Sequence, residues 1–330
     1  MKRTFDEVTT LQYNKTMSTT LIIVLLIALF YLLGKTADMV VLTIRRIGEL
    51  FDIRVFFLGI LLGLFTALPE FSIAINALIT GIPEISLGNL LGGIVVLLSL
   101  VLGGSILLNR SINTDGKVSN ILPILIYLFL PIIAGLDGNL NILEGLTFIV
   151  AYFLLIFHLF KQNKNHEQAK RIEVKKSLLL KNGFVVLAGV VFIILISNLI
   201  IRLTQMLLQN YDIPAFIVGL LIFSIGTNLP EISVMIRSWF RKVQELSIGN
   251  LMGSAIAHVL IIGILSFTRT IYINLNASYL SLFFFISILL VAFAYFYRTG
   301  HSFSFREGIM LLIAYLAFVG SQIFFLLAGA

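Results

Sequence analysis

The feature that most constrains this chain is an internal repeat that carries a glutamate inside an apolar stretch. The segment TALPEFSIAI at 66–75 matches TNLPEISVMI at 227–236, and EISLGNLLGG at 84–93 matches ELSIGNLMGS at 245–254. The two pairs share one offset, because 227 − 66 and 245 − 84 both give 161. Apolar residues match by chance, but Thr, Pro, Glu, Ser, Gly and Asn do not readily recur in register. We therefore expect two copies of one structural unit.

Composition places both copies in a lipid bilayer. Of the 330 residues, 59% are hydrophobic and 12% are charged, and mean hydropathy is +1.05, whereas a soluble domain is about half apolar and about a quarter charged. Helices that cross about 30 Å of hydrocarbon are predicted near 18–45, 53–80, 83–109, 119–135, 140–160, 183–209, 213–240, 243–267, 277–297 and 305–327. We expect an all-α integral membrane protein of about ten helices.

The basic residues indicate the orientation of these helices. Nearly all of them fall in loops that alternate onto one side, and the positive-inside rule assigns that side to the cytoplasm. We therefore expect a multi-pass protein of the plasma (cell inner) membrane with both termini outside. The net charge of +7 then reports topology, and no nucleic-acid partner is expected. The chain has no cysteine, which excludes disulfides and thiol chemistry.

One long polar segment divides the chain into two halves. Residues 161–182 are the expected cytoplasmic linker between a first five-helix repeat at 1–160 and a second at 183–330. Because five is odd, the second copy must enter the membrane in the opposite orientation. Inverted repeats are typical of secondary transporters, which bind substrate near the midplane between the repeats.

Glu70 and Glu231 occupy matched positions of the repeat and lie well inside predicted helices. An ionised carboxylate at that depth costs on the order of several kcal/mol unless it is paired or hydrated. No basic residue is expected at the same depth, so cation or proton binding is favoured over a structural salt bridge. Pro69 and Pro230 precede the glutamates, and a proline within a helix leaves carbonyls of the preceding turn free to bind cations.

Oxygen atoms near these glutamates are sufficient for a hard cation. Ca²⁺ takes about six to eight oxygen ligands. The expected metal ligands besides Glu70 and Glu231 are the carbonyls of Thr66 and Thr227, the side chains of Asn228 and Ser254, and water. The glycines of the two GNxxG patterns are expected to allow close helix packing. Asn89 and Asn250 in those patterns are either interhelical hydrogen-bonding residues or neighbours of the site.

With these motifs the chain resembles the cation/Ca²⁺ exchanger superfamily, which includes Na⁺/Ca²⁺ and H⁺/Ca²⁺ exchangers. Members carry two α-repeats, each with a TSLPE-like element followed by GNxxGSN, and the likeness is specific at 63–103 and 224–264. The resemblance implies ten helices in two inverted five-helix halves. It also implies carboxylate ligands at Glu70 and Glu231 and backbone-carbonyl ligands at Thr66 and Thr227.

The sequence departs from the superfamily pattern at the site itself. The usual hydroxyl after GNxxG is Ser254 in the second repeat but Gly93 in the first. Four residues further on, Leu97 and His258 replace the usual Asn or Asp, and Ala67 replaces a small hydroxyl. These changes remove oxygen ligands. Histidine is the side chain that ordinarily changes charge near neutral pH, so His258 is either a packed neutral side chain or a residue that couples transport to protons.

Three functions follow from these observations. The leading prediction is secondary active antiport by alternating access at a midplane site containing Glu70 and Glu231, with Ca²⁺ exchanged for Na⁺ or H⁺. One alternative is a monovalent cation/proton antiporter that uses the same glutamates and His258. The other is a non-transporting homologue that senses cations or acts as a scaffold. No enzymatic or ATP-binding motif such as HExxH or GxxxxGK[ST] is present, so neither an enzyme nor a cofactor is expected.

Overall fold

A computed structural model of the chain describes residues 18–50, 62–162, 176–211, 213–241, 248–299 and 302–328. The first half contains α2 (Thr19–Leu50), α4 (Leu68–Ile79), α5 (Pro83–Val95), the π-helix η1 (Val96–Val101), α6 (Leu102–Asn109), β1 (Ser111–Asn113), α7 (Val118–Ala134), the 3₁₀ turn η2 (Gly135–Asp137), β2 (Asn139–Leu140) and α8 (Ile142–Gln162). The second half contains α9 (Lys176–Asn210), α10 (Ala215–Val218), the π-helix η3 (Gly219–Phe223), α11 (Ser224–Thr227), α12 (Leu229–Arg241), α13 (Ile248–Thr268), β3 (Ile271–Tyr272), α14 (Ala277–Arg298), β4 (Ser302–Ser304) and α15 (Phe305–Ala328).

The all-α membrane architecture is confirmed. Among the described residues, eight helices are long and apolar enough to cross a membrane, and a bent pair over Ala215–Thr227 and Leu229–Ile236 makes up to nine. The apolar helix α4 is shorter, with 12 residues, and follows a helical stretch at 62–66. Residues 53–61 of the helix expected at 53–80 lie outside the described part. The arrangement agrees with about ten membrane helices.

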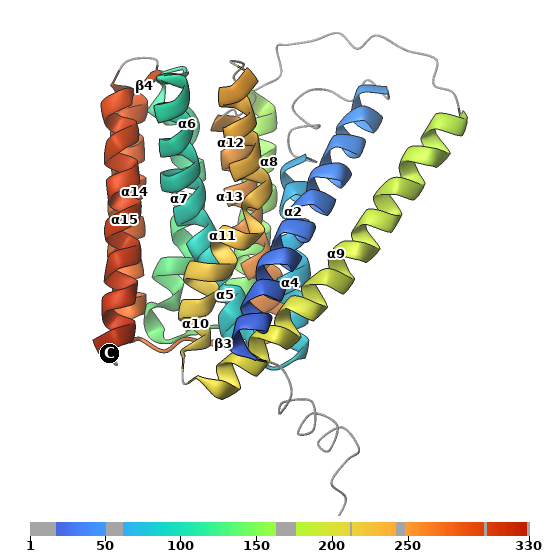
Figure 1. The fold of residues 1–330 in the computed structure, drawn as a ribbon. Helices are drawn as coiled ribbons and strands as arrows, with labels where there is room; N and C mark the ends of the chain where they lie inside the picture. The colour runs from blue at the N-terminus through green and yellow to red at the C-terminus, as the bar shows by residue number, and fades with distance from the viewer. Residues whose placement is uncertain are drawn as a thin grey trace, which may run out of the picture.

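The two halves run through the bundle in opposite directions (Figure 1). The α2 helix begins at the lower edge of the view and α8 ends at the upper edge, whereas α9 begins at the upper edge and α15 ends at the lower one. The long helices α2 and α9, one from each half, pack against each other and lean beside the remaining helices. Two short antiparallel strand pairs, β1 with β4 and β2 with β3, join the halves at opposite ends.

Both helices that carry a repeat glutamate are interrupted immediately before it. The breaks lie at Ala67, with φ −85° and ψ 9°, and at Asn228, with φ −85° and ψ 14°. The second break bends the chain by 44° near mid-height of the bundle (Figure 1). The expected spans near 53–80 and 213–240 are therefore interrupted at these points, next to the prolines that were expected to disturb the preceding turn. The physical reason is that Pro69 and Pro230 have no N–H to donate and fit the first turn of a new helix, where no such bond is needed.

The helix ends next to the linker also differ from the expectation. The α9 helix begins at Lys176 instead of at 183, and α8 continues to Gln162. Lysines are tolerated at the end of a membrane helix because their long side chains reach out to the polar interface. The linker residues 163–175 and the expected helix start at 243–247 lie outside the described residues. The domain division stays a prediction.

Glycines bring the repeat helices into backbone contact, as the GNxxG patterns predict. A Cβ atom added at Gly88 would lie 2.2 Å from the Phe216 carbonyl oxygen, and one at Gly92 would lie 2.6 Å from that of Leu220. These contacts seat α5 against α10 and η3. The α5 helix of the first repeat is thereby packed directly beside the broken helix of the second.

Candidate cation-binding site

Glu70 and Glu231 each lie in the first turn of a helix that follows a break. Glu70 belongs to α4 and is 1% exposed, and Glu231 belongs to α12 and is 7% exposed. The unpaired N–H groups at a helix N-terminus carry partial positive charge and favour a carboxylate there. The two carboxylates are also close enough to interact electrostatically. The fold thus brings both repeat glutamates together in the interior.

One hydroxyl group lies beside Glu231, and a second hydroxyl lies beside the first. The Ser254 hydroxyl lies 3.4 Å from Glu231 Oε1 and 3.0 Å from the Thr66 hydroxyl. The Thr66 hydroxyl donates to the Gly63 carbonyl at 2.9 Å, and the Ser254 hydroxyl donates to Glu231 Oε1. Glu231 Oε2 has no hydrogen-bond partner among the described residues, so Glu231 keeps acceptor capacity for a further partner.

The surroundings of Glu70 are different. Its Oε1 atom lies 3.7 Å from His258 Nε2, and both residues are 1% exposed. This distance exceeds that of a hydrogen bond, and neither ring nitrogen of His258 has a hydrogen-bond partner among the described residues. Glu70 consequently faces an imidazole where Glu231 faces a hydroxyl.

The predicted site residues Thr227, Asn228 and Asn89 lie in the same buried region. The Thr227 hydroxyl lies 3.0 Å from both Asn89 Oδ1 and the Phe223 carbonyl oxygen. The Asn228 amide donates to the Ser224 carbonyl at 2.8 Å, which leaves Asn228 Oδ1 available. Asn89 is therefore a neighbour of the cluster, whereas its repeat counterpart Asn250 is exposed.

Unsatisfied polar atoms concentrate around the two glutamates. Nine buried side-chain atoms lack a hydrogen-bond partner in the described part of the chain. Six of them belong to site residues: Glu70 Oε2, Glu231 Oε2, Asn228 Oδ1, Asn89 Nδ2, and both ring nitrogens of His258. Each such atom costs about 1–3 kcal/mol, and folded proteins contain few of them. Their concentration at one place makes the region around Glu70 and Glu231 the candidate site.

Carboxylates and imidazole alone do not complete a metal site here. Within the described ranges, no group of three or more His, Cys, Asp or Glu side chains is arranged to hold a metal ion. A cation would therefore need hydroxyl, amide or carbonyl oxygens such as those of Thr66, Ser254 and Asn228. Their ligand roles stay predictions.

The family model described as a sodium/calcium exchanger protein matches residues 21–161 and 181–324 of the chain. The chain belongs to this exchanger family. The gap between the matched ranges falls within the expected linker. The resemblance seen in the repeats is confirmed by this match, and the family consists of transporters, not of enzymes.

Relatives and solved structures agree with this assignment. An uncharacterized membrane protein of Methanocaldococcus jannaschii is 24% identical over 300 residues, which covers 88% of this exchanger and 96% of the relative. The solved sodium-calcium exchanger NCX_Mj is 21% identical with a TM-score of 0.65, covering 92% of this chain and 99% of that one. The H⁺/Ca²⁺ exchanger CAX is 13% identical with a TM-score of 0.72, covering 97% and 87%. At these identities the two structures establish the fold.

Sequence reasoning missed a polar contact between α4 and α9 of this exchanger. The Ser72 and Ser197 hydroxyls are hydrogen-bonded, and Asn76 Nδ2 lies 3.1 Å from Ser197 Oγ. Asn198 Nδ2 donates to Asn76 Oδ1 at 2.9 Å. The available signal was a pair of adjacent polar residues, Ser197 and Asn198, within the apolar run of α9. We call these four residues the α4–α9 polar contact.

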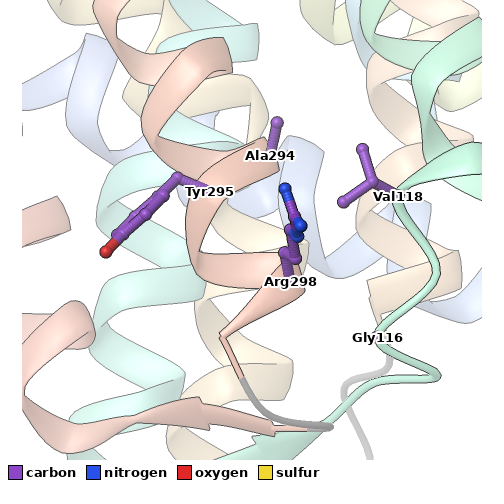
Figure 2. Close-up of a pocket in the computed structure, with 5 residues that line it drawn as sticks. All are labelled: Gly116, Val118, Ala294, Tyr295 and Arg298. Carbon is purple, nitrogen blue, oxygen red and sulfur yellow. The ribbon is translucent and has the colours of Figure 1, made fainter.

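One cavity among the described residues of the exchanger lies away from the glutamates. A cavity of about 380 Å³ between the start of α7 and the end of α14 is lined by Gly116, Val118, Ala294, Tyr295 and Arg298. Figure 2 shows the Arg298 side chain running back along α14 toward Ala294, opposite Val118. None of the predicted site residues lines this cavity. With Glu70 and Glu231 nearly inaccessible, the candidate site is closed to solvent in this conformation.

Proposed function

We propose that this protein is a secondary active antiporter that exchanges Ca²⁺ for Na⁺ or H⁺ at a site formed around Glu70 and Glu231. Membership in a family of cation exchangers supports cation antiport. The observation that carries the proposal is the cluster of six partnerless polar atoms at the two carboxylates. Three of those atoms are oxygens that only accept, and oxygen acceptors are the ligands that Ca²⁺ and Na⁺ require.

The proposed mechanism uses competition for one set of oxygens. The carboxylates of Glu70 and Glu231, the hydroxyl of Ser254, the amide oxygen of Asn228 and the carbonyls of Thr66 and Thr227 would hold the cation. Because an unbound pair of buried carboxylates is costly, each occupant leaves only when another replaces it. Alternating access then requires that the closed site open to one side at a time, as inverted halves permit.

Liposomes test this proposal directly. Purified protein is reconstituted, and ⁴⁵Ca²⁺ uptake is followed under an outward Na⁺ gradient or an outward H⁺ gradient. We expect uptake under one gradient in the wild type and none in Glu70→Gln or Glu231→Gln. Glu84→Gln is the matched control, because Glu84 begins α5 outside the buried cluster and should leave uptake unchanged. Absence of uptake under both gradients would refute the Ca²⁺ assignment.

A monovalent cation/proton antiporter is the second candidate. The observation in its favour is His258, which lies beside Glu70 and supplies no oxygen, while Gly93 and Leu97 also supply none. This candidate predicts Na⁺ flux driven by a pH gradient in the absence of Ca²⁺, followed with ²²Na⁺. A non-transporting homologue would instead show cation-dependent thermal stabilisation without flux of either ion.

The distribution of basic residues also bears on the orientation of the protein in the membrane. The basic loops support a cytoplasmic position for the linker end of the bundle, and both ends of the described chain lie at the opposite edge (Figure 1). We therefore propose that both termini face outward across the plasma (cell inner) membrane.

A further inference from the structure

Gly93 and His258, which both depart from the superfamily pattern, lie far apart in the sequence but close together beside Glu70. A Cβ atom added at Gly93 of α5 would lie 2.5 Å from His258 Cε1 and 2.8 Å from His258 Nδ1 on α13. It would also lie 3.2 Å from Asn228 Nδ2. Real Cβ atoms essentially never approach other atoms within 3.0 Å. The imidazole therefore occupies the space that any side chain at position 93 would need.

His258 is buried at this position. It is 1% exposed, and its ring lies between the surface of Gly93 and the carboxylate of Glu70. Protein interiors are close-packed, so a ring of this size displaces everything else from the same volume. Glycine at 93 and histidine at 258 are consequently one paired arrangement and not two separate changes.

The second repeat shows what the first repeat lacks. Position 93 corresponds to Ser254, and position 97 corresponds to His258, because 254 − 93 and 258 − 97 both give 161. Ser254 places a hydroxyl oxygen beside Glu231 and Thr66. Gly93 has no hydroxyl to offer Glu70, and the imidazole ring of His258 occupies the position beside that carboxylate. A neutral imidazole offers a nitrogen ligand, which suits hard cations such as Ca²⁺ or Na⁺ poorly compared with oxygen.

We propose that the Gly93–His258 pair fills one ion position with protein, so that the exchanger binds a single cation at a time, on the side of Glu231, Ser254 and Thr66. This inference rests on the proposed cation site and specifies its occupancy. Glu70 still contributes a free oxygen, Oε2, toward that cation. His258 and Gly93 thus determine how many ions are bound.

A thermal unfolding cycle tests the paired arrangement without any transport. Full-length wild type, Gly93→Ser, His258→Asn and the double variant are compared in detergent. Gly93→Ser should lower the melting temperature markedly, because its side chain meets the ring, and His258→Asn in the same chain should restore most of the loss. Equal stability of Gly93→Ser and wild type, or losses that simply add, would overturn the pairing.

Equilibrium binding of ⁴⁵Ca²⁺ and ²²Na⁺ to the same proteins tests the occupancy. The wild type should bind one cation per chain, and the double variant should bind more, because it gains a hydroxyl and an amide oxygen. If Gly93→Ser does not accumulate, His258→Asn alone carries the test, since it opens the same space without adding an atom at 93. No binding, or more than one cation in the wild type, contradicts the proposal.

Flux measurements separate this inference from the proposed function. In liposomes the wild type should show a Hill coefficient of about one for the driving cation, and the double variant a larger one. If the wild type binds one cation but shows no flux, antiport fails while the single-cation site stands. If flux occurs with a Hill coefficient well above one in the wild type, antiport stands and the single-cation site fails.

Discussion

The Glu70 and Glu231 halves of the site have nearly the same backbone and different chemistry. The breaks at Ala67 and Asn228 agree within a few degrees in φ and ψ, and each glutamate occupies the first turn of the next helix. Yet Glu231 has a hydroxyl neighbour and Glu70 has an imidazole neighbour. The shared LPE element therefore sets where the carboxylates lie, while residues on the neighbouring helices set what each carboxylate can bind.

Neutralising either glutamate should lower the apparent cation affinity more than any other change, and the two losses should differ between the halves. Removing one charged partner of a buried ion costs about 3–5 kcal/mol, or roughly a hundredfold or more in affinity. We expect Glu231→Gln to weaken apparent cation affinity more than Glu70→Gln, because hydroxyl oxygens accompany only Glu231. Cation titrations of thermal stability measure both constants. Equal losses in the two variants would mean that the cation lies symmetrically between the halves.

Alanine substitutions at matched glycines of the two repeats should lower the stability of the protein by different amounts. Gly92 and Gly253 are repeat counterparts, since 253 − 92 gives 161. A Cβ atom at Gly92 would lie 2.6 Å from a carbonyl oxygen, whereas the nearest atom at Gly253 is 3.6 Å away. We expect Gly92→Ala to cost about 1–3 kcal/mol and Gly253→Ala almost nothing, as read from melting temperatures in detergent. A reversed order would show that the repeat helices pack differently.

A smaller difference in stability is expected when matched hydroxyl groups on α9 and α2 are removed. Ser197 is fully buried and bonds across to Ser72 and Asn76, whereas its counterpart Thr36 donates only to Leu32 of its own helix. Ser197→Ala should cost on the order of 1 kcal/mol, and Thr36→Ala should leave the melting temperature unchanged. If both substitutions are neutral, the α4–α9 polar contact contributes no stability.

Single cysteines should map the orientation with no effect on flux. The chain has no cysteine of its own, so a membrane-impermeant maleimide reports only the introduced residue. We expect labelling from outside at Asn274→Cys, beside the lower strand pair, and none at Ser304→Cys, beside the upper one. The opposite labelling pattern in intact cells would place both termini in the cytoplasm.

The repeat, the apolar composition and the odd number of helices in each half together predicted the membrane fold, the inverted halves and the position of Glu70 and Glu231 inside it. These predictions depend on periodic apolar runs and on residues matched at a fixed offset, which are local properties of the sequence. Pro69 and Pro230 predicted a disturbance of the preceding turn but not the start of a new helix, because a proline inside an apolar run fits a kinked helix and a new helix equally well. The contact of Gly93 with His258 joins α5 to α13, and only the packing of the helices reveals it.

The α4–α9 polar contact also bears on which way the empty protein faces. Consider a transporter built from two inverted halves of identical sequence. If each half takes up the conformation of the other, the outward-open state becomes an inward-open state, and the two states have equal free energy. Ser197 bonds across to α4 besides bonding within α9, while Thr36 bonds within α2, so the two halves are not chemically identical at this pair. A difference of about 1.4 kcal/mol shifts such an equilibrium tenfold. We therefore expect the balance between the outward-open and inward-open states of the empty protein to depend on the positions where the two repeats differ.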